Sequence, residues 1–167
     1  MKKILISIVA LLTINTYCVA ENMEMYDTNG KKYTVDANND SIKISEMEGK
    51  VVFLEFFGLK CPACKQEMPH LINLQKKYPE KVKIMAIEVQ KNDNDPINAY
   101  KKANGINYTT FSNYDVGLIV RYIADKSGWN GSIPFMVAID SKGNVQFSQA
   151  GIIEEDELEK YVEKFSK

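Results

Sequence analysis

The sequence predicts an α/β domain with a mixed central β-sheet, helices on both faces of that sheet, and an N-terminal hairpin. Residues 51–57 (VVFLEFF) and 82–89 (VKIMAIEV) are almost entirely apolar and rich in β-branched residues, as strands buried on both faces are. A helical pattern separates them, which implies a parallel pair. Strands at 135–139 and 145–148 are joined by a tight turn at 140–143, so we expect an antiparallel edge.

The chain before and after the first buried strand is assigned from turn residues and apolar spacing. A Thr-Asn-Gly turn predicts a short hairpin over residues 23–35. The polar stretch 41–50 is expected to be a short helix or loop. Beyond the first buried strand, an apolar stripe at helical spacing runs to about Tyr78, and Pro79 marks the end of that helix.

Three more helices are predicted from their caps and patterns. Asp95 can cap a helix that has Pro96 at its first position and that Gly105 stops. Residues 114–126 place their apolar side chains on one face. Residues 153–165 form an amphipathic closing helix with an acidic first turn, which favours a helix N-terminus.

The first twenty residues have the layout of a secretory signal peptide. Lys2 and Lys3 precede an apolar run of about eleven residues, shorter than the about twenty that a membrane-spanning helix needs. Small residues lead to Ala20, so we expect cleavage there; an uncleaved N-terminal anchor is the alternative. We interpret residues 1–20 as a signal peptide and residues 21–167 as one domain, in the periplasm or otherwise outside the cytoplasm.

Charge and cysteine content exclude several classes of protein. Without Lys2 and Lys3 the 21 basic residues become 19, against 22 acidic residues, so nothing indicates a nucleic-acid-binding surface. Cleavage would also remove Cys18 and leave only Cys61 and Cys64. Small stapled domains usually carry about four to eight cysteines, and a loop this short removes little entropy from the unfolded chain. We therefore do not interpret the pair as a structural staple.

The position of Cys61 and Cys64 indicates redox chemistry. They follow the buried strand 51–57, where the next helix begins. Free backbone N–H groups and the positive end of the helix dipole favour a thiolate at Cys61, and Lys60 adds positive charge. We expect Cys61 to be the exposed nucleophile and Cys64, one turn further, to be the more buried resolving thiol. The alternative is a pair of inert buried thiols.

These motifs together resemble a known family. The strand VVFLEFF, the stretch CPACKQEMP, a strand opened by Ile133-Pro134, and IDSKGNV before the last helix resemble the thioredoxin fold. More narrowly, they resemble the exported TlpA/ResA-type thiol–disulfide oxidoreductases of the cytochrome c maturation branch, over residues 44–165. The resemblance implies a redox disulfide between Cys61 and Cys64, a cis peptide bond before Pro134, and no cofactor. The chain departs from thioredoxins in the residue before the first cysteine and in the Pro-Ala dipeptide between the two.

The resemblance also implies a substrate-binding surface around the disulfide. Pro62 and Ala63 lie between the cysteines, and Pro134 faces the pair. Ile133 keeps a free backbone edge, with which a substrate chain can pair by strand addition. Trp129 lies near the same loop, where it either contacts substrate or packs in the core.

Two carboxylates are candidate catalytic residues. Glu55 occupies the position of the buried acid of thioredoxins, and an ionised side chain inside an apolar strand is costly. We expect Glu55 to lie beneath the pair and take the proton of Cys64, unless it reaches solvent at the strand end. Glu67 matches the Glu of the C-x-x-C-x-x-E-x-P pattern, which tunes the active-site cysteines in the resembled branch; a solvated helix glutamate is the alternative. His70 is expected to be exposed.

The resemblance predicts a reductase of protein disulfides that a membrane thiol reductase recharges, with the apocytochrome c thiols as a candidate client. The alternative is a disulfide-introducing oxidase recharged by a quinone-linked membrane protein. Oxidases of the usual type insert a large helical domain where this chain has only residues 90–132, so we favour a reductase and expect a monomer.

Metal binding, including copper delivery, is the rival function from a different class. A closed zinc site needs four ligands, and this chain offers two thiols and one histidine after cleavage. Copper-delivery relatives place three residues between their cysteines and add a distant histidine. A peroxiredoxin would need a Thr-x-x-Cys site ahead of the helix. Neither pattern is present, so no metal is expected.

Overall fold

The computed structural model describes residues 21–167. The predicted signal peptide, residues 1–20, lies outside the described residues, as does Cys18. Within the described part, no helix has the length and apolar character needed to cross a membrane. In chain order the elements are β1 (Glu21–Tyr26), β2 (Lys32–Asn38), β3 (Ser41–Ile44), the 3-10 helix η1 (Ser45–Met47), β4 (Val51–Phe57), α1 (Pro62–Lys77), β5 (Val82–Glu88), α2 (Asn94–Asn104), β6 (Thr109–Ser112), α3 (Asn113–Ser127), β7 (Phe135–Ile139), β8 (Val145–Ala150) and α4 (Glu155–Phe165).

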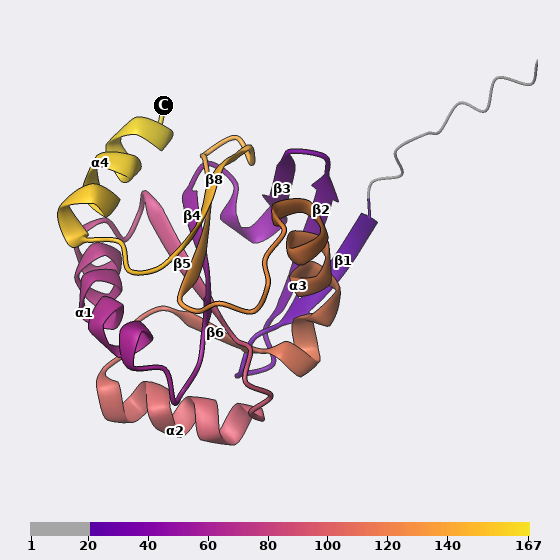
Figure 1. Ribbon diagram of the computed structural model, residues 1–167. Coiled ribbons are helices and arrows are strands. Elements are labelled where there is room, and N and C mark those ends of the chain that lie inside the picture. The colour runs from indigo at the N-terminus through magenta and orange to yellow at the C-terminus, as the bar shows by residue number, and fades with distance from the viewer. Residues whose placement is uncertain (1–20) are drawn as a thin grey trace, which may run out of the picture.

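A five-stranded mixed sheet forms the centre of the molecule (Figure 1), and hydrogen bonding between its strands gives the order β6-β5-β4-β7-β8. β4 pairs in parallel with β5 and antiparallel with β7. The parallel pair and the antiparallel edge strand β8 confirm the predicted mixed sheet. Every residue of β4 is buried, because this strand has a neighbour on each side and a layer on each face.

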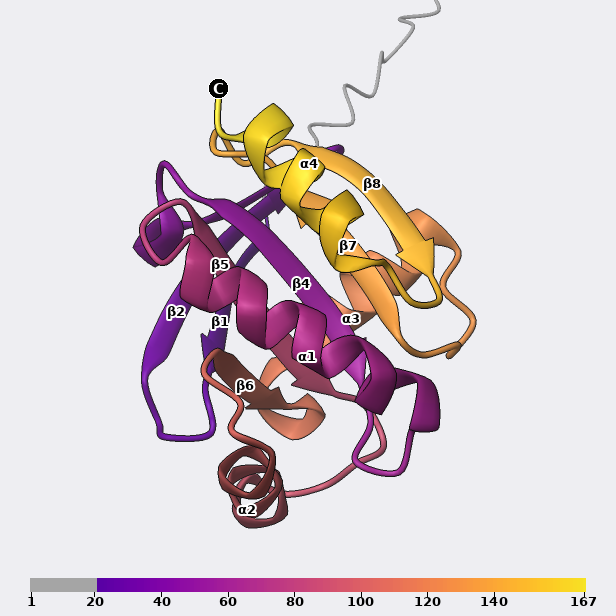
Figure 2. The ribbon, with the colours of Figure 1, turned by 90° about the vertical axis from the view of Figure 1, so that its left-hand side faces the viewer.

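Both faces of the central sheet are covered, as Figures 1 and 2 show. α1 and α4 lie on one face, and α3 lies on the other together with the three-stranded sheet β1-β2-β3. Alternation along β4 divides the core between these faces. Phe53 and Phe57 pack with α1, whereas Leu54 and Phe56 pack with α3 and the N-terminal sheet.

The N-terminal hairpin is confirmed, and a third strand extends it. β3 falls within residues 41–50, which were predicted to be a short helix or loop, so the prediction was wrong for Ser41–Ile44; only η1 is helical. The reason lies in the pairing of β3 with β2 and in its buried Ile42 and Ile44, which alternate with more polar positions. Four residues are too few for that alternation to be recognised from sequence.

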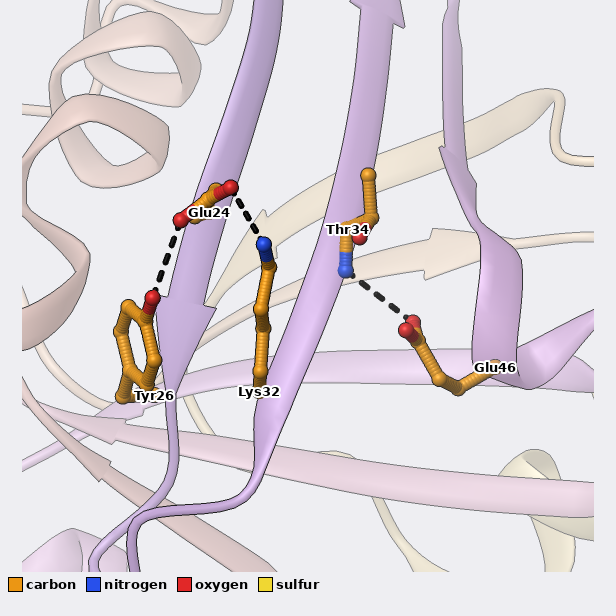
Figure 3. A network of polar contacts seen from close by, with 5 residues as sticks. All are labelled: Glu24, Tyr26, Lys32, Thr34 and Glu46. Carbon is orange, nitrogen blue, oxygen red and sulfur yellow. Dashed lines mark hydrogen bonds and ion pairs between the residues drawn. The ribbon is translucent and has the colours of Figure 1, made fainter.

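The outer face of the N-terminal sheet is polar (Figure 3). Glu24 accepts hydrogen bonds from the Tyr26 hydroxyl at 2.9 Å and from the Lys32 ammonium. The backbone N–H of Thr34 donates to the carboxylate of Glu46 at 3.1 Å. Because the opposite face is apolar and buried against the central sheet, the three strands form a layer of this domain and not a separate one.

Two predictions around β6 need correction. The strand itself, Thr109–Ser112, was not predicted, and it completes the sheet beside β5. Its outer edge is held by the hairpin turn: the Thr28 N–H donates to the Thr110 carbonyl at 2.9 Å. The N-cap of α2 is Asp93, whereas Asp95 lies in its first turn; the predicted stop at Gly105 is confirmed.

Candidate active site

The disulfide lies where β4 passes into α1, as predicted. Cys61 is the N-cap residue of α1, and its Sγ accepts a hydrogen bond from the backbone N–H of Cys64 at 3.1 Å. Pro62 occupies the first helical position, where a missing N–H costs nothing. Cys61 and Cys64 are joined by a disulfide with a Cα–Cα distance of 5.3 Å. The bond therefore fits the first turn of the helix.

Cys61 is less exposed than predicted. Its relative exposure is 6%, against 2% for Cys64, so the expected order holds but both residues are largely buried in the disulfide form. One cause is the loop before β7, because the Cys61 Sγ lies 3.8 Å from the carbonyl oxygen of Ile133. Beside Cys61, Pro62 is exposed and Ala63 is half-buried.

The loop opposite the disulfide contains the cis peptide bond Ile133–Pro134, which confirms that expectation. Ile133 lies outside the strand register, which begins at the Phe56–Phe135 pair. Trp129 packs its ring against Phe56 at a centroid distance of 4.7 Å, and its indole N–H donates to the Ser132 carbonyl at 2.7 Å. The half-buried Trp129 therefore anchors this loop to the core.

Glu55 and Glu67 are both buried, which rules out solvated positions for either. Glu55 alternates with Phe53 and Phe57 on β4, so its side chain points to the face that α1 covers. Glu67 lies one turn after Cys64 on α1 and therefore faces the same side of the helix. The Glu67 Oε1 accepts a hydrogen bond from the Ile153 N–H at 2.9 Å, whereas its Oε2 receives none from an N–H or hydroxyl of the described residues.

Burial makes both carboxyl groups hard to ionise. It raises the pKa of Glu55 well above its ordinary value of 4.5, and the neighbouring charge of Glu67 raises this pKa further. Burial also raises the pKa of Glu67, to about 7, although the hydrogen bond from the Ile153 N–H and the charge of His70 oppose this rise. The two groups can therefore hold one proton between them near neutral pH.

Sequence reasoning missed several groups near this pair. Tyr108 is buried, and burial followed by the charges of Glu55 and Glu67 raises the pKa of its hydroxyl. The Tyr100 hydroxyl is buried without a hydrogen-bond partner among the described residues. Nothing in the sequence indicated that these two tyrosines lie near Glu55 and Glu67, because only the packing of α2 and of the segment that leads into β6 brings them there. His70 was expected to be exposed; it is half-buried, with Nδ1 3.1 Å from the Ile153 carbonyl.

The described residues contain no group of three or more His, Cys, Asp or Glu side chains arranged to hold a metal ion. What the arrangement offers is a disulfide at a helix N-terminus, a cis-proline loop against it, and buried carboxyl groups on the same face. On this fold, those features define a thiol–disulfide oxidoreductase of the thioredoxin type.

Comparisons with known proteins agree with this class. The chain belongs to the AhpC/TSA family, which it matches over residues 20–148. It is 31% identical over 154 residues to the thiol-disulfide oxidoreductase ResA of Bacillus thuringiensis subsp. konkukian, covering 88% of this chain and 76% of that protein. The resemblance to ResA-type oxidoreductases is therefore confirmed.

Solved structures share the fold. A thioredoxin-family thiol:disulfide interchange protein from Chlorobium tepidum has a TM-score of 0.68 and 21% identity, covering 89% of this chain and 95% of that one. A secreted Mycobacterium tuberculosis disulfide oxidoreductase, described as homologous to DsbE of E. coli, has a TM-score of 0.63 and 21% identity, covering 85% and 95%. The predicted thioredoxin-like fold is thus confirmed.

Proposed function

We propose that this protein is an extracytoplasmic reductase of protein disulfides. The observation that carries the proposal is the Cys61–Cys64 disulfide at the N-terminus of α1 with two buried carboxyl groups on the same face. The sequence of residues 1–20 and the secreted relative support a location outside the cytoplasm. Proteins with oxidised thiols, such as an apocytochrome c, are the clients, and a membrane thiol reductase restores the dithiol. The protein acts as a monomer.

The reaction has two exchange steps. The Cys61 thiolate attacks one sulfur of a client disulfide, which forms a mixed disulfide and releases the first client thiolate. Cys64 then loses its proton to the carboxyl pair of Glu55 and Glu67, which holds one proton near neutral pH and can take a second, and attacks the Cys61 sulfur. This attack releases the second client thiolate and closes the Cys61–Cys64 disulfide. Two electrons pass to the client, and its two thiolates take up two protons. Ile133 and Pro134 position the client backbone beside the sulfur, and Pro62, Ala63 and Trp129 border that surface.

The carboxyl groups favour the reducing direction. A stabilised thiolate stabilises the dithiol form and makes a protein an oxidant. Glu67, one helical turn from Cys64, and Glu55 beneath the helix add negative charge on ionisation and so oppose thiolate accumulation. By disfavouring the thiolate, the two carboxyl groups lower the reduction potential. The helix dipole at Cys61, which favours the thiolate, acts in the opposite direction.

The test is the equilibrium reduction potential of the purified protein against glutathione. A value of about −270 mV or below fits the reductase, whereas a value near about −120 mV would assign the oxidase instead. The Glu55→Gln and Glu67→Gln variants extend the test, because each should raise the potential. An unchanged potential in both would remove the argument from the carboxyl groups.

A further inference from the structure

The loop between β4 and the first cysteine is held by a side chain from beyond the next strand. The Oε1 of Gln90 accepts a hydrogen bond from the backbone N–H of Lys60 at 3.1 Å. The same side chain crosses Gly58, since a Cβ atom there would lie 2.3 Å from the Gln90 Cδ. The Cys61 N–H in turn donates to the Gly58 carbonyl at 3.2 Å. Gln90 therefore contacts the loop at two points immediately before the nucleophile.

Gln90 itself projects from a rigid base. Glu88 is fully buried at the end of β5, and its Oε1 accepts hydrogen bonds from the Gln90 N–H at 3.1 Å and the Asn92 amide at 2.8 Å. The Glu88 Oε2 accepts a hydrogen bond from the Asn92 backbone N–H at 2.9 Å. The Ser112 hydroxyl closes the cluster by donating to the Asn92 carbonyl at 2.8 Å. A buried carboxylate bonded in this way fixes the backbone that carries Gln90.

We propose that Gln90 is a positioning residue for Cys61. The side-chain amide of Gln90 keeps the loop before Cys61 in the conformation that places the Cys61 sulfur at the N-terminus of α1. In the oxidised protein the disulfide also holds this sulfur. In the dithiol form that covalent tie is absent, so the Gln90 contact carries the positioning. Without it, the thiolate interacts less well with the free N–H groups of the first helical turn. The inference rests on the nucleophilic role proposed for Cys61.

The experiment measures alkylation of the reduced protein by iodoacetamide as a function of pH, with each modified cysteine assigned by peptide mass spectrometry. In Gln90→Ala we expect Cys61 to titrate at higher pH and to react about fivefold more slowly at pH 6, the effect of losing one hydrogen bond. Gln146→Ala is the matched control, because Gln146 is an exposed glutamine whose amide binds Asp140 at 2.8 Å in another part of the molecule. It should keep the wild-type profile.

Gly58→Ala provides an independent test of the same contact. The added methyl group must displace the Gln90 amide from Lys60, so this variant should show the same slower alkylation. In the double variant with Gln90→Ala the collision is absent, and alkylation should be no slower than in Gln90→Ala alone. Additive effects, or a wild-type profile in Gln90→Ala, would overturn the inference. If Cys64 reacts first in the wild type, the proposed role of Cys61 fails instead.

Discussion

Single residues set the chemistry proposed for this site, and the proposal gives the two cysteines different tasks. Cys61 caps α1 and contacts the cis-proline loop, whereas Cys64 is the more buried sulfur. Replacing Cys61 with Ser removes the proposed attacking thiolate, so insulin-disulfide reduction should fall to background. Replacing Cys64 with Ser leaves the attack but removes the resolving thiol, so mixed disulfides should accumulate on non-reducing gels. Undiminished turnover in Cys61→Ser would contradict these roles.

Glu67 gives the protein a defined pH dependence of stability. Its pKa is about 7 in the folded protein, against an ordinary value of 4.5. Between these values the folded protein keeps a proton that the unfolded chain has released, so the free energy of unfolding falls as pH rises. This one group contributes a loss of about 3 kcal/mol between about pH 4.5 and pH 7. Glu55, whose pKa burial also raises, acts in the same direction.

Urea unfolding of the oxidised protein at pH 5 and pH 8 measures this loss. Glu67→Gln keeps an oxygen for the Ile153 N–H but cannot ionise, so its loss between the two pH values should be clearly smaller than in the wild type. Glu163→Gln, at an exposed position on α4, should keep the wild-type loss. Equal losses in all three proteins would show that Glu67 does not retain its proton.

Sequence reasoning could find the residues that a local period places together. Glu67 follows Cys64 by one helical turn, and Glu55 alternates within an apolar strand, so both positions could be inferred from the sequence alone. Gln90 could not be inferred in this way. Its contact with Lys60 depends on the register of β4 against β5, which no local pattern determines.

Among the elements, α1 also closes an open edge of the central sheet. β6 pairs with β5 only from Met85 onward, so within residues 21–167 no strand pairs with the first half of β5 on that side. Gln75 occupies this place: its Nε2 donates to the Val82 carbonyl and its Oε1 accepts from the Ile84 N–H, each at 3.0 Å. One side chain thus continues the backbone pairing where β6 is absent.

Replacing Gln75 with Leu should leave the Ile84 N–H and the Val82 carbonyl buried and unpaired. The expected cost is about 2 to 6 kcal/mol of unfolding free energy, since each of these two groups costs about 1 to 3 kcal/mol. Urea unfolding measures it, with Gln66→Leu on the exposed side of the same helix as the control. A loss below about 0.5 kcal/mol, typical of surface substitutions, would mean that water replaces the amide.

Element length decided which parts of the fold could be predicted. β4, β5, α1, α3 and α4 are long enough for their apolar patterns to be recognised, and the residues at the ends of α2 indicated that helix. β3 and β6 have four residues each, and distant partners hold them: β2 pairs with β3, and the Thr28 hydroxyl lies 2.9 Å from the Thr110 hydroxyl on β6. Such strands form because of the tertiary structure and carry little pattern of their own.

Across the whole molecule, the three-stranded sheet and the central sheet share one apolar cluster. Tyr33 joins these layers, since its buried ring lies edge-on to Phe111 at a centroid distance of 5.4 Å. Replacing Tyr33 with Ala should cost about 3 to 5 kcal/mol, as for other large aromatic side chains removed from a core. Tyr26→Ala is the matched control, because Tyr26 lies on the exposed face of the same sheet (Figure 3) and should cost little.

Two optical signals can show whether these layers unfold together. The sequence has one tryptophan, Trp129, which packs on Phe56 within the same cluster but next to the active-site loop. If the layers form one cooperative unit, Tyr33→Ala should lower the urea midpoint equally by far-UV circular dichroism and by Trp129 fluorescence. An early change in circular dichroism with an unshifted Trp129 transition would mean that the N-terminal sheet unfolds first. The cis-proline loop would then keep its place without that layer.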